Sequence, residues 1–171
     1  KHDYALDDLI VLNENKFVTQ GIDGFKPILT QDLFAGYYGN QTLVQGSRYR
    51  PLSLLTFAVE WEFFGKSPHI SHFLNVIFYS ISVIIVYIVL AMLFRKVDEN
   101  KKWFLSFSFI GTLLYVAHPL HTEVVANIKG RDEIFSLLFS FSALFFWLRY
   151  HEYKKLKDLL LGLFVFFLAL L

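Results

Sequence analysis

The sequence predicts an all-α integral membrane protein, a multi-span helical bundle with a large polar first loop. Of its 171 residues, 55% are hydrophobic and 19% aromatic, whereas an ordinary soluble domain has about 45–50% apolar residues. Uncharged runs alternate with short charged segments. The longest, Phe73–Phe94, holds 22 residues without a charge. As a helix it would reach about 33 Å, enough to cross a ~30 Å hydrocarbon core.

Residues 1–68 form the first loop, a mixed polar and aromatic region punctuated by Gly and Pro, in which no apolar run is long enough to span a bilayer. Within it, Ser53–Gly65 predicts a short amphipathic helix, with Glu60 and Glu62 away from its apolar stripe. We expect this helix to lie at the membrane interface with Trp61 as its anchor. The stripe consists of Leu54, Phe57, Ala58, Trp61 and Phe64.

Residues 69–171 predict transmembrane helices. The second and third apolar runs have 15 residues each, fewer than the ~20 usual for a crossing. The segment between them, 118–133, is therefore expected to be drawn toward the membrane, where ionisable groups normally face a cavity or the protein interior. An ordinary exposed loop is the alternative. The helices are expected at about 73–94, 103–117, 134–148 and 159–171, the last incomplete.

The distribution of Lys and Arg predicts the orientation. Loops 95–102 and 149–158 each carry four of the sixteen basic residues, and short basic loops remain in the cytoplasm. Residues 1–68 and 118–133 then share the periplasmic or lumenal side. Because the chain starts at Lys1 and ends within an apolar run, we expect a longer polypeptide.

Two motifs of the first loop carry candidate chemistry. Asp7 and Asp8 are adjacent carboxylates, and their repulsion can raise the pKa of one, which then serves as a general base. One of them could instead hold a metal with His2 or Asp3, and a helix N-cap or a solvated turn is the remaining alternative. Arg48 and Arg50 flank Tyr49 and can clamp a phosphate through planar guanidinium groups. They can equally be surface residues that precede a helix.

Histidines occur on both sides of the first long run. His69, His72 and Asn75 recur every three residues and so share one helix face, either as a ligand-facing stripe or as interfacial groups that bond another helix. The segment 118–133 contains two histidines, three acids, a lysine and an arginine. Its candidate pocket residues are His118, His121 and Glu123, and its candidate phosphate ligands are Lys129 and Arg131, which flank Gly130.

No metal site is expected. The chain has no cysteine, and the HExxH pattern of zinc proteases is absent from the sequence. Asn40 opens a short NQT match to the N-glycosylation pattern, which matters only in a compartment that glycosylates. The net charge of +1 indicates no polyanionic partner and hence no nucleic acid.

The ordered motifs "DD", "RYRPL", "SHFLN" and above all "HPLHTEVVANIKGRDE" (His118–Glu133) resemble the transmembrane and tetratricopeptide-repeat family of protein O-mannosyltransferase-like proteins, within the GT-C glycosyltransferases. The resemblance runs from Tyr4 to Tyr150. It implies a GT-C-like bundle in which a sugar, such as mannose, passes from a polyprenyl-phosphate donor to a protein hydroxyl. The N-terminal span, the later helices and the repeat domain of that family lie outside this sequence.

The resemblance also implies residue roles. Asp7 or Asp8 would be the catalytic base, and Arg131, with Lys129 and Arg50, would bind the donor phosphate. The pocket would be lined by His118, His121, Glu123, His72 and Asn75, with no metal or other cofactor. The expected partners are the lipid-linked sugar, a protein acceptor, the bilayer and other membrane subunits, in the bacterial inner membrane or the endoplasmic reticulum.

Two other functional classes compete with this interpretation. One is a non-catalytic membrane scaffold subunit of the same ancestry, which would tolerate loss of the acids. The other is a transporter or channel, which would place ionisable residues deep within its spans. The first long run has none between Phe73 and Phe94, and this argues against a transport path.

Overall fold

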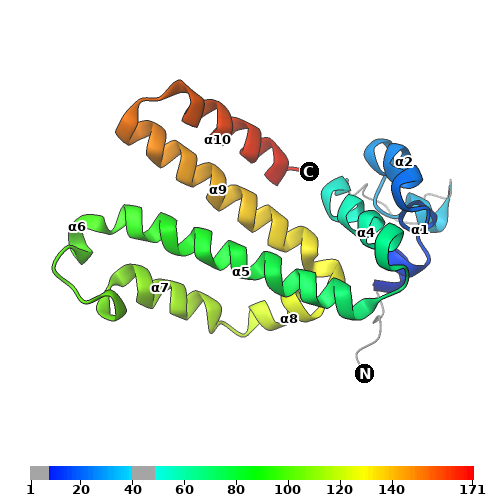
Figure 1. Cartoon of the computed structure of the whole chain (residues 1–171), viewed down its shortest axis with the longest axis horizontal. Coiled ribbons are helices and arrows are strands. Elements are labelled where there is room, and N and C mark those ends of the chain that lie inside the picture. Colours follow the sequence, from blue (N-terminus) through cyan, green and yellow to red (C-terminus); the bar gives the residue numbers. More distant parts are fainter. Residues whose placement is uncertain (1–7, 40–48) are drawn as a thin grey trace. The chain divides into compact units, whose positions relative to one another are not determined.

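The structure, a computed structural model, describes residues 8–39 and 49–171. All regular elements within these ranges are helical, which confirms the predicted all-α class (Figure 1). Short turns of π or 3-10 helix lie at Leu9–Asn13, Gly21–Gly24, Trp103–Leu105 and Ile128–Gly130. The α-helices are α1 (Lys16–Thr19), α2 (Phe25–Thr30), α3 (Ala35–Tyr38), α4 (Pro51–Phe64), α5 (Pro68–Leu93), α6 (Arg95–Asp98), α7 (Phe107–Val116), α8 (Leu120–Ala126), α9 (Arg131–Tyr153) and α10 (Leu156–Ala169).

The described residues divide into two compact units. The first unit contains 8–39, 49–76, 124–132 and Leu171, and the second contains 77–123 and 133–170. The predicted outer segment 118–133 is therefore shared: its first part belongs to the second unit, and most of its second part belongs to the first.

The first unit has its own small apolar core. α4 begins with Pro51, whose fixed φ suits a first helical turn, and ends at Gly65 with φ 60°. Leu54, Phe57 and Ala58 of its predicted stripe are at most 1% exposed. Ile128, from the outer polar segment, is completely buried in the same core. The remaining core residues are Val11, Leu12, Val18, Ile28 and Leu33.

The predicted face of α4 is only partly the buried one. Phe64, assigned to the apolar stripe, is 56% exposed, as is its neighbour Phe63 at 70%. Glu60, placed away from the stripe, is 7% exposed. The helix wheel was therefore wrong at Phe64 and at Glu60, and Glu60 is buried because it has a buried cationic partner, described below. The interfacial placement of α4 remains a prediction.

The second unit consists of long apolar helices joined by aromatic contacts. Ring pairs connect α5 to α7 through Tyr79 and Tyr115, with centroids 6.3 Å apart, and α5 to α9 through Phe78 and Phe135 at 4.9 Å. α9 and α10 meet where Gly162 allows the indole of Trp147 to approach, since a Cβ there would lie 2.5 Å from its ring.

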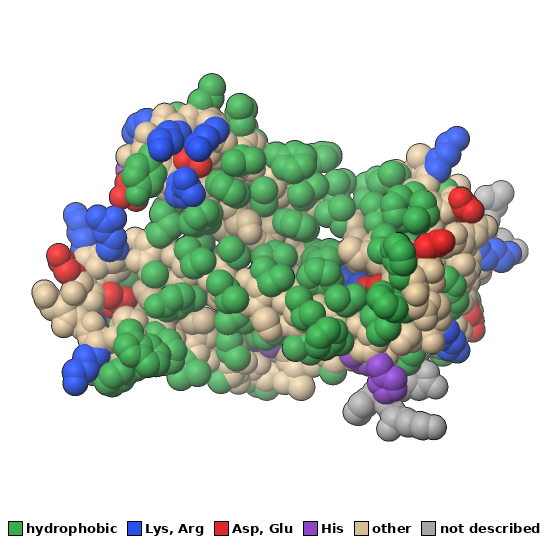
Figure 2. Space-filling model, viewed as in Figure 1, with side chains coloured by type: hydrophobic (Ala, Val, Ile, Leu, Met, Phe, Trp, Pro, Cys, Tyr) green, Lys and Arg blue, Asp and Glu red, His purple; other side chains and the backbone are tan. Residues whose placement is uncertain are grey.

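In the described part of the chain, two helices are long and apolar enough to cross a membrane. They are Pro68–Leu93 and the combined helical stretch Ile128–Tyr153, whose most apolar windows are only 17% and 22% buried within the chain. Such exposure suits helices that face lipid. Figure 2 shows hydrophobic side chains over much of the visible face of the second unit. α7 has ten residues, about 15 Å of helix, which is too short to cross a bilayer.

Two helices extend beyond their predicted ends into segments that were predicted to be loops. α5 starts at Pro68, five residues before the predicted span, and α9 continues to Tyr153. The predicted loop 149–158 is thereby reduced to Lys154 and Lys155 between α9 and α10. Arg95 of the other basic loop pairs with Glu152 of α9, with Nη1 to Oε1 at 3.0 Å. The side of the membrane that the two basic loops face remains a prediction.

Candidate functional site

The first loop and the outer polar segment meet in the first unit at Asp8. The backbone N–H of Lys129 donates a 2.8 Å hydrogen bond to Oδ1 of Asp8, 121 positions earlier in the sequence. Asp8 is 2% exposed and makes no side-chain capping hydrogen bond to the turn Leu9–Asn13 that follows it. Its carboxylate therefore serves a tertiary contact, and neither the N-cap nor the solvated-turn alternative describes it.

Arg131, one of the three predicted phosphate ligands, lies at the buried start of α9. Its side chain is 0% exposed. Nε donates to Oδ1 of Asn75 at 2.7 Å, Nη1 donates to Oγ1 of Thr56 at 3.0 Å, and Nη2 donates to the carbonyl of Ser71 at 3.0 Å. Nη1 also forms an ion pair with Oε1 of Glu60. The guanidinium group thus binds side chains and backbone of α4 and α5.

The partners of Arg131 are themselves bonded. Ser71 Oγ donates to Oε2 of Glu60 at 2.6 Å, so both carboxylate oxygens of Glu60 accept hydrogen bonds. The guanidinium carbon lies 4.1 Å from the centre of the Phe57 ring, a cation–π distance. A phosphate could contact Arg131 in this arrangement only by displacing a protein partner.

The turn before Arg131 is held by Asn75. Its Nδ2 donates to the carbonyls of Asn127 and Ile128 at 3.4 and 3.2 Å, while Oδ1 of Asn127 accepts from the N–H of Lys129 at 3.2 Å. A Cβ at Gly130 would lie 2.4 Å from the carbonyl oxygen of Val124. The close approach for which Gly130 is required is therefore to the protein's own backbone.

Arg50 makes the third contact between the first loop and the outer segment. Its Nη1 pairs with Oδ2 of Asp132, and the two side chains are 41% and 11% exposed. Unlike Arg131, Arg50 keeps a substantial part of its side chain accessible. Lys129 is half-buried. The first unit thus brings Asp8, Arg50, Asn75, Lys129 and Arg131 into one set of contacts, as far as the described residues show.

His118 and His121 lie in the second unit, in an aromatic group. The His121 ring is 4.2 Å from the Tyr115 ring and 5.7 Å from the Tyr79 ring, centre to centre, and His118 lies 5.9 Å away. Burial, together with the nearby His118, lowers the pKa of His121. A neutral His121 can accept or donate a hydrogen bond at pH 7. Glu123 is exposed.

The remaining predicted residues are placed as follows. Asp7 lies outside the described residues, as do Arg48 and Asn40. His72 is half-buried on α5, whereas His69 is exposed. Within residues 8–39 and 49–171, no group of three His, Asp or Glu side chains is arranged to hold a metal ion.

Sequence reasoning missed three residues of this site: Thr56, Glu60 and Ser71. Glu60 follows the buried Phe57 by three positions and Thr56 by four, so it sits beside the apolar face of α4. An acid at such a position needs a buried cation or a protonated state, because an isolated buried charge is costly. That signal pointed to a cation elsewhere, although not to Arg131 in particular.

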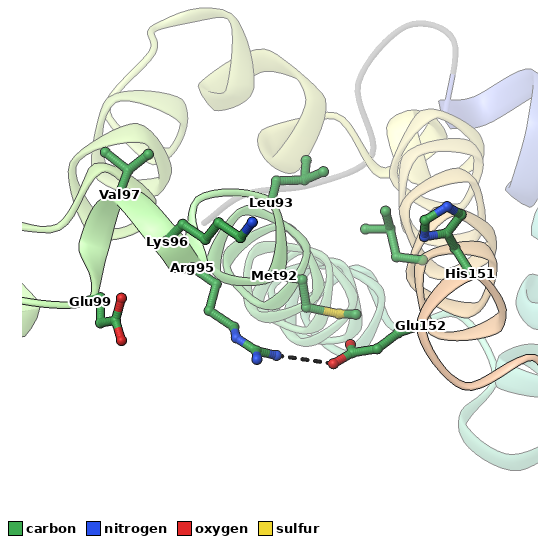
Figure 3. A pocket seen from close by; sticks show the side chains of 9 residues that line it. Met92, Leu93, Arg95, Lys96, Val97, Glu99, His151 and Glu152 are labelled. Atoms are coloured by element: carbon green, nitrogen blue, oxygen red, sulfur yellow. Dashed lines mark hydrogen bonds and ion pairs between the residues drawn. The ribbon is translucent and has the colours of Figure 1, made fainter.

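A separate open cavity of about 860 Å³ lies in the second unit. Figure 3 shows its walls, formed by the end of α5, by α6 and by the end of α9, with the Arg95–Glu152 ion pair crossing one side. Both cationic and acidic side chains line it. Its lining residues are Met92, Leu93, Arg95, Lys96, Val97, Glu99, Leu148, His151 and Glu152.

Comparison with known proteins relates the chain to animal protein O-mannosyl-transferases. It is 29% identical over 144 residues to protein O-mannosyl-transferase F38B6.6 of Caenorhabditis elegans, covering 83% of the chain and 19% of that protein. It is 36% identical over 95 residues to human TMTC3 (56% and 9% covered) and 27% over 136 residues to human TMTC1 (80% and 14%). The chain thus spans less than a fifth of each of these relatives. No family model and no solved structure matches it.

Proposed function

We propose, from the similarity of the chain to the TMTC family of protein O-mannosyl-transferases, that it belongs to this family and forms the first outer loop and first membrane helices of a membrane glycosyltransferase. The donor is a sugar, mannose in the simplest case, on a polyprenyl phosphate, and the acceptor is a protein hydroxyl. Residues 1–68 and 118–133 face the lumen or periplasm, in a GT-C-like multi-span bundle with other membrane segments.

The proposed reaction needs a base and a cationic site. The base removes the proton of the acceptor hydroxyl as its oxygen attacks the anomeric carbon, and the bond from that carbon to the phosphate oxygen breaks. The polyprenyl phosphate leaves with the bonding electrons, and its growing negative charge requires cations. The lipid tail of the donor keeps this chemistry at the membrane surface.

The observation that carries the proposal is the contact of Asp8 with the backbone of Lys129. It joins the loop that bears the two acids to the segment that bears the cations, as the reaction requires. We assign the base to Asp7 or Asp8 and the donor phosphate to Arg50 and Lys129. Arg131 is left out of this set because its guanidinium group is enclosed by protein partners.

The pocket-lining roles of the other predicted residues remain proposals. Asn75 is occupied on both sides of its amide, by Arg131 and by the turn 127–128, so we propose that it supports the site without touching the sugar. His72, His118, His121 and Glu123 remain candidates for contact with donor or acceptor. No metal or cofactor is part of the proposed reaction.

A scaffold subunit of the same ancestry is the second candidate. It is favoured by the environment of Arg131 and Glu60, because both buried side chains are hydrogen-bonded to protein partners. Residues with such a structural role would be kept in a protein without catalytic activity. The two candidates differ in whether the protein binds the lipid-linked donor.

Donor binding separates them. The full-length protein in detergent is titrated with polyprenyl phosphate, and bound lipid is measured by native mass spectrometry. We expect wild type to bind and Arg50→Gln to bind about tenfold more weakly, which is the loss of about 1.4 kcal/mol for one charge-assisted contact. Arg95→Gln, in the basic loop of the second unit, is the matched control and should bind as wild type. A wild-type protein that binds no donor supports the scaffold.

A further inference from the structure

One ion pair connects the polar contacts of the first unit. Arg131 and Glu60 pair with side-chain exposures of 0% and 9%. Lys129, two residues before Arg131, donates its N–H to the carboxylate of Asp8. A displacement of Arg131 would therefore move the turn that carries this contact.

The same holds on the other side of Arg131. The next residue, Asp132, pairs with Arg50. Arg131 therefore lies between two contacts of the outer segment. Lys129 contacts the candidate base Asp8, and Asp132 contacts the candidate phosphate ligand Arg50. Its own anchors lie on α4 and α5, through Glu60 and Asn75.

We infer that Glu60 and Arg131 are positioning residues, which hold the turn 127–132 so that Asp8 and Arg50 keep the arrangement needed for transfer, and that Arg131 is not a ligand of the donor phosphate. The inference rests on the proposed function. It deepens that proposal by separating the cation that meets the donor from the cation that orders the site.

The physical reason is the demand of a buried charge. A buried guanidinium is stable only when a carboxylate and further acceptors satisfy it. Here Glu60 supplies the charge, Thr56 and Asn75 supply side-chain acceptors, and Ser71 supplies a carbonyl. A phosphate at the same nitrogens would bring a second anion next to Glu60, and like charges at that distance repel strongly.

A double-mutant cycle tests the inference in the full-length protein. Glu60→Gln, Arg131→Gln and the double variant are compared with wild type below the melting temperature of every variant, for sugar transfer and for polyprenyl-phosphate affinity. Each single change leaves one buried charge unpaired, and we expect roughly tenfold or greater loss of kcat. The double variant has no unpaired charge and should regain about tenfold over Arg131→Gln, with donor Kd close to that of wild type.

A phosphate ligand would behave differently. If Arg131 binds the donor, both variants that lack it show the same raised Kd, and removal of Glu60 rescues nothing; this result overturns the inference. Where Arg131→Gln does not accumulate as folded protein, Arg131→Lys takes its place, because lysine keeps the charge for Glu60 but cannot make the remaining contacts. Glu60→Asp keeps the charge on a shorter side chain and should fall between wild type and Glu60→Gln.

The matched control is the exposed pair Arg95 and Glu152, whose side chains are 75% and 41% exposed. Its two single variants and its double variant should show additive, near-neutral effects. A wild-type protein that binds no donor and transfers no sugar defeats the proposed function. A wild-type protein that transfers sugar, with additive effects at Glu60 and Arg131, defeats the positioning inference alone.

Discussion

The backbone N–H of Lys129 donates its hydrogen bond to the carboxylate of Asp8 across 2.8 Å. This contact joins the acid-bearing start of the chain to the cation-bearing outer segment, although helices α1 to α7 lie between them in the sequence. A buried carboxylate in such a contact has two separable properties, its hydrogen-bond acceptor and its charge. Substitutions can remove them one at a time.

Asp8→Asn should keep the acceptor and therefore most of the stability, whereas Asp8→Ala should lose it. A hydrogen bond to a charged group contributes about 1.5–3 kcal/mol, so the alanine variant is expected to be destabilised by about that amount. Thermal unfolding of the full-length protein in detergent measures both. Asp23→Ala, an exposed acid of the same loop, is the control. Equal losses for Asp8→Asn and Asp8→Ala would mean that the charge, and not the acceptor, is what the fold requires.

Asp132 should compete with the donor for Arg50. The two side chains form an ion pair. A phosphate that binds Arg50 must therefore displace the carboxylate of Asp132 or share the guanidinium group with it. Asp132→Asn should therefore tighten polyprenyl-phosphate binding by roughly threefold, since a partly exposed pair is worth about 0.2–1 kcal/mol. Arg50→Gln should act in the opposite direction. Isothermal titration or native mass spectrometry measures both, and a weaker Kd for Asp132→Asn would rule out the competition.

Gly130 should not accept a side chain. A Cβ there would lie 2.4 Å from the carbonyl oxygen of Val124, which is backbone and cannot rotate away. We expect Gly130→Ala to destabilise the protein by about 1–3 kcal/mol, the usual cost of overpacking. Gly111→Ala is the control, because its Cβ would meet Leu90 at an ordinary 3.4 Å. Equal melting temperatures for the two variants would show that the turn adapts.

The loop between α6 and α7 should weaken at low pH through Asp98. Burial acts to raise the pKa of Asp98, but hydrogen bonds from Ser108 Oγ and from the N–H groups of Phe107 and Ser108, with the charge of Lys101, outweigh it and lower the pKa. A lowered folded-state pKa gives stabilisation that is complete above the unfolded value, about 3.8, and is lost as pH falls through the folded value.

Hydrogen exchange of the Phe107 and Ser108 amides reports this change. Protection should fall as the pH drops below about 3.8 and through the lowered folded-state pKa of Asp98, beyond the intrinsic pH dependence of exchange. Asp98→Asn, which cannot titrate, should show only that intrinsic dependence. If Asp98→Asn loses as much amide protection at low pH as wild type does, a group other than Asp98 causes the loss.

The sequence predicted the helical class and the first long helix well, because uncharged runs and their lengths are direct signals of both. Charge-based topology predicted only that the first loop and the outer segment face one side of the membrane, and the contact between Asp8 and Lys129 goes beyond that prediction. The sequence did not predict that the segment would contribute Ile128 to a core otherwise formed by the first loop. Nothing in the sequence around Ile128 marks it for burial against the first loop, so this part of the fold depends on tertiary packing.

The candidate site shows the same limit. Arg131 was recognised as important from its motif and its ionisable neighbours, but its environment depends on Glu60, 71 residues away. Helical spacing placed Glu60 away from the apolar stripe, since a wheel ranks positions by hydrophobicity alone. Only a charge partner in space explains its burial. The roles of Arg50 and Arg131 likewise differ because the Arg50 side chain is partly exposed and the Arg131 side chain is buried. No sequence pattern distinguishes the two arginines in this respect.

Sugar transfer by acid variants tests the central claim most directly. The full-length protein is assayed with radiolabelled polyprenyl-phosphate mannose and an acceptor protein, comparing Asp7→Asn, Asp8→Asn and the exposed-acid control Asp23→Asn with wild type. If the chain supplies the base, at least one of the first two variants loses roughly 100-fold or more of kcat with little change in donor affinity, and the control retains its activity. Unchanged transfer in both variants, with the protein folded, would contradict the account and leave the scaffold interpretation.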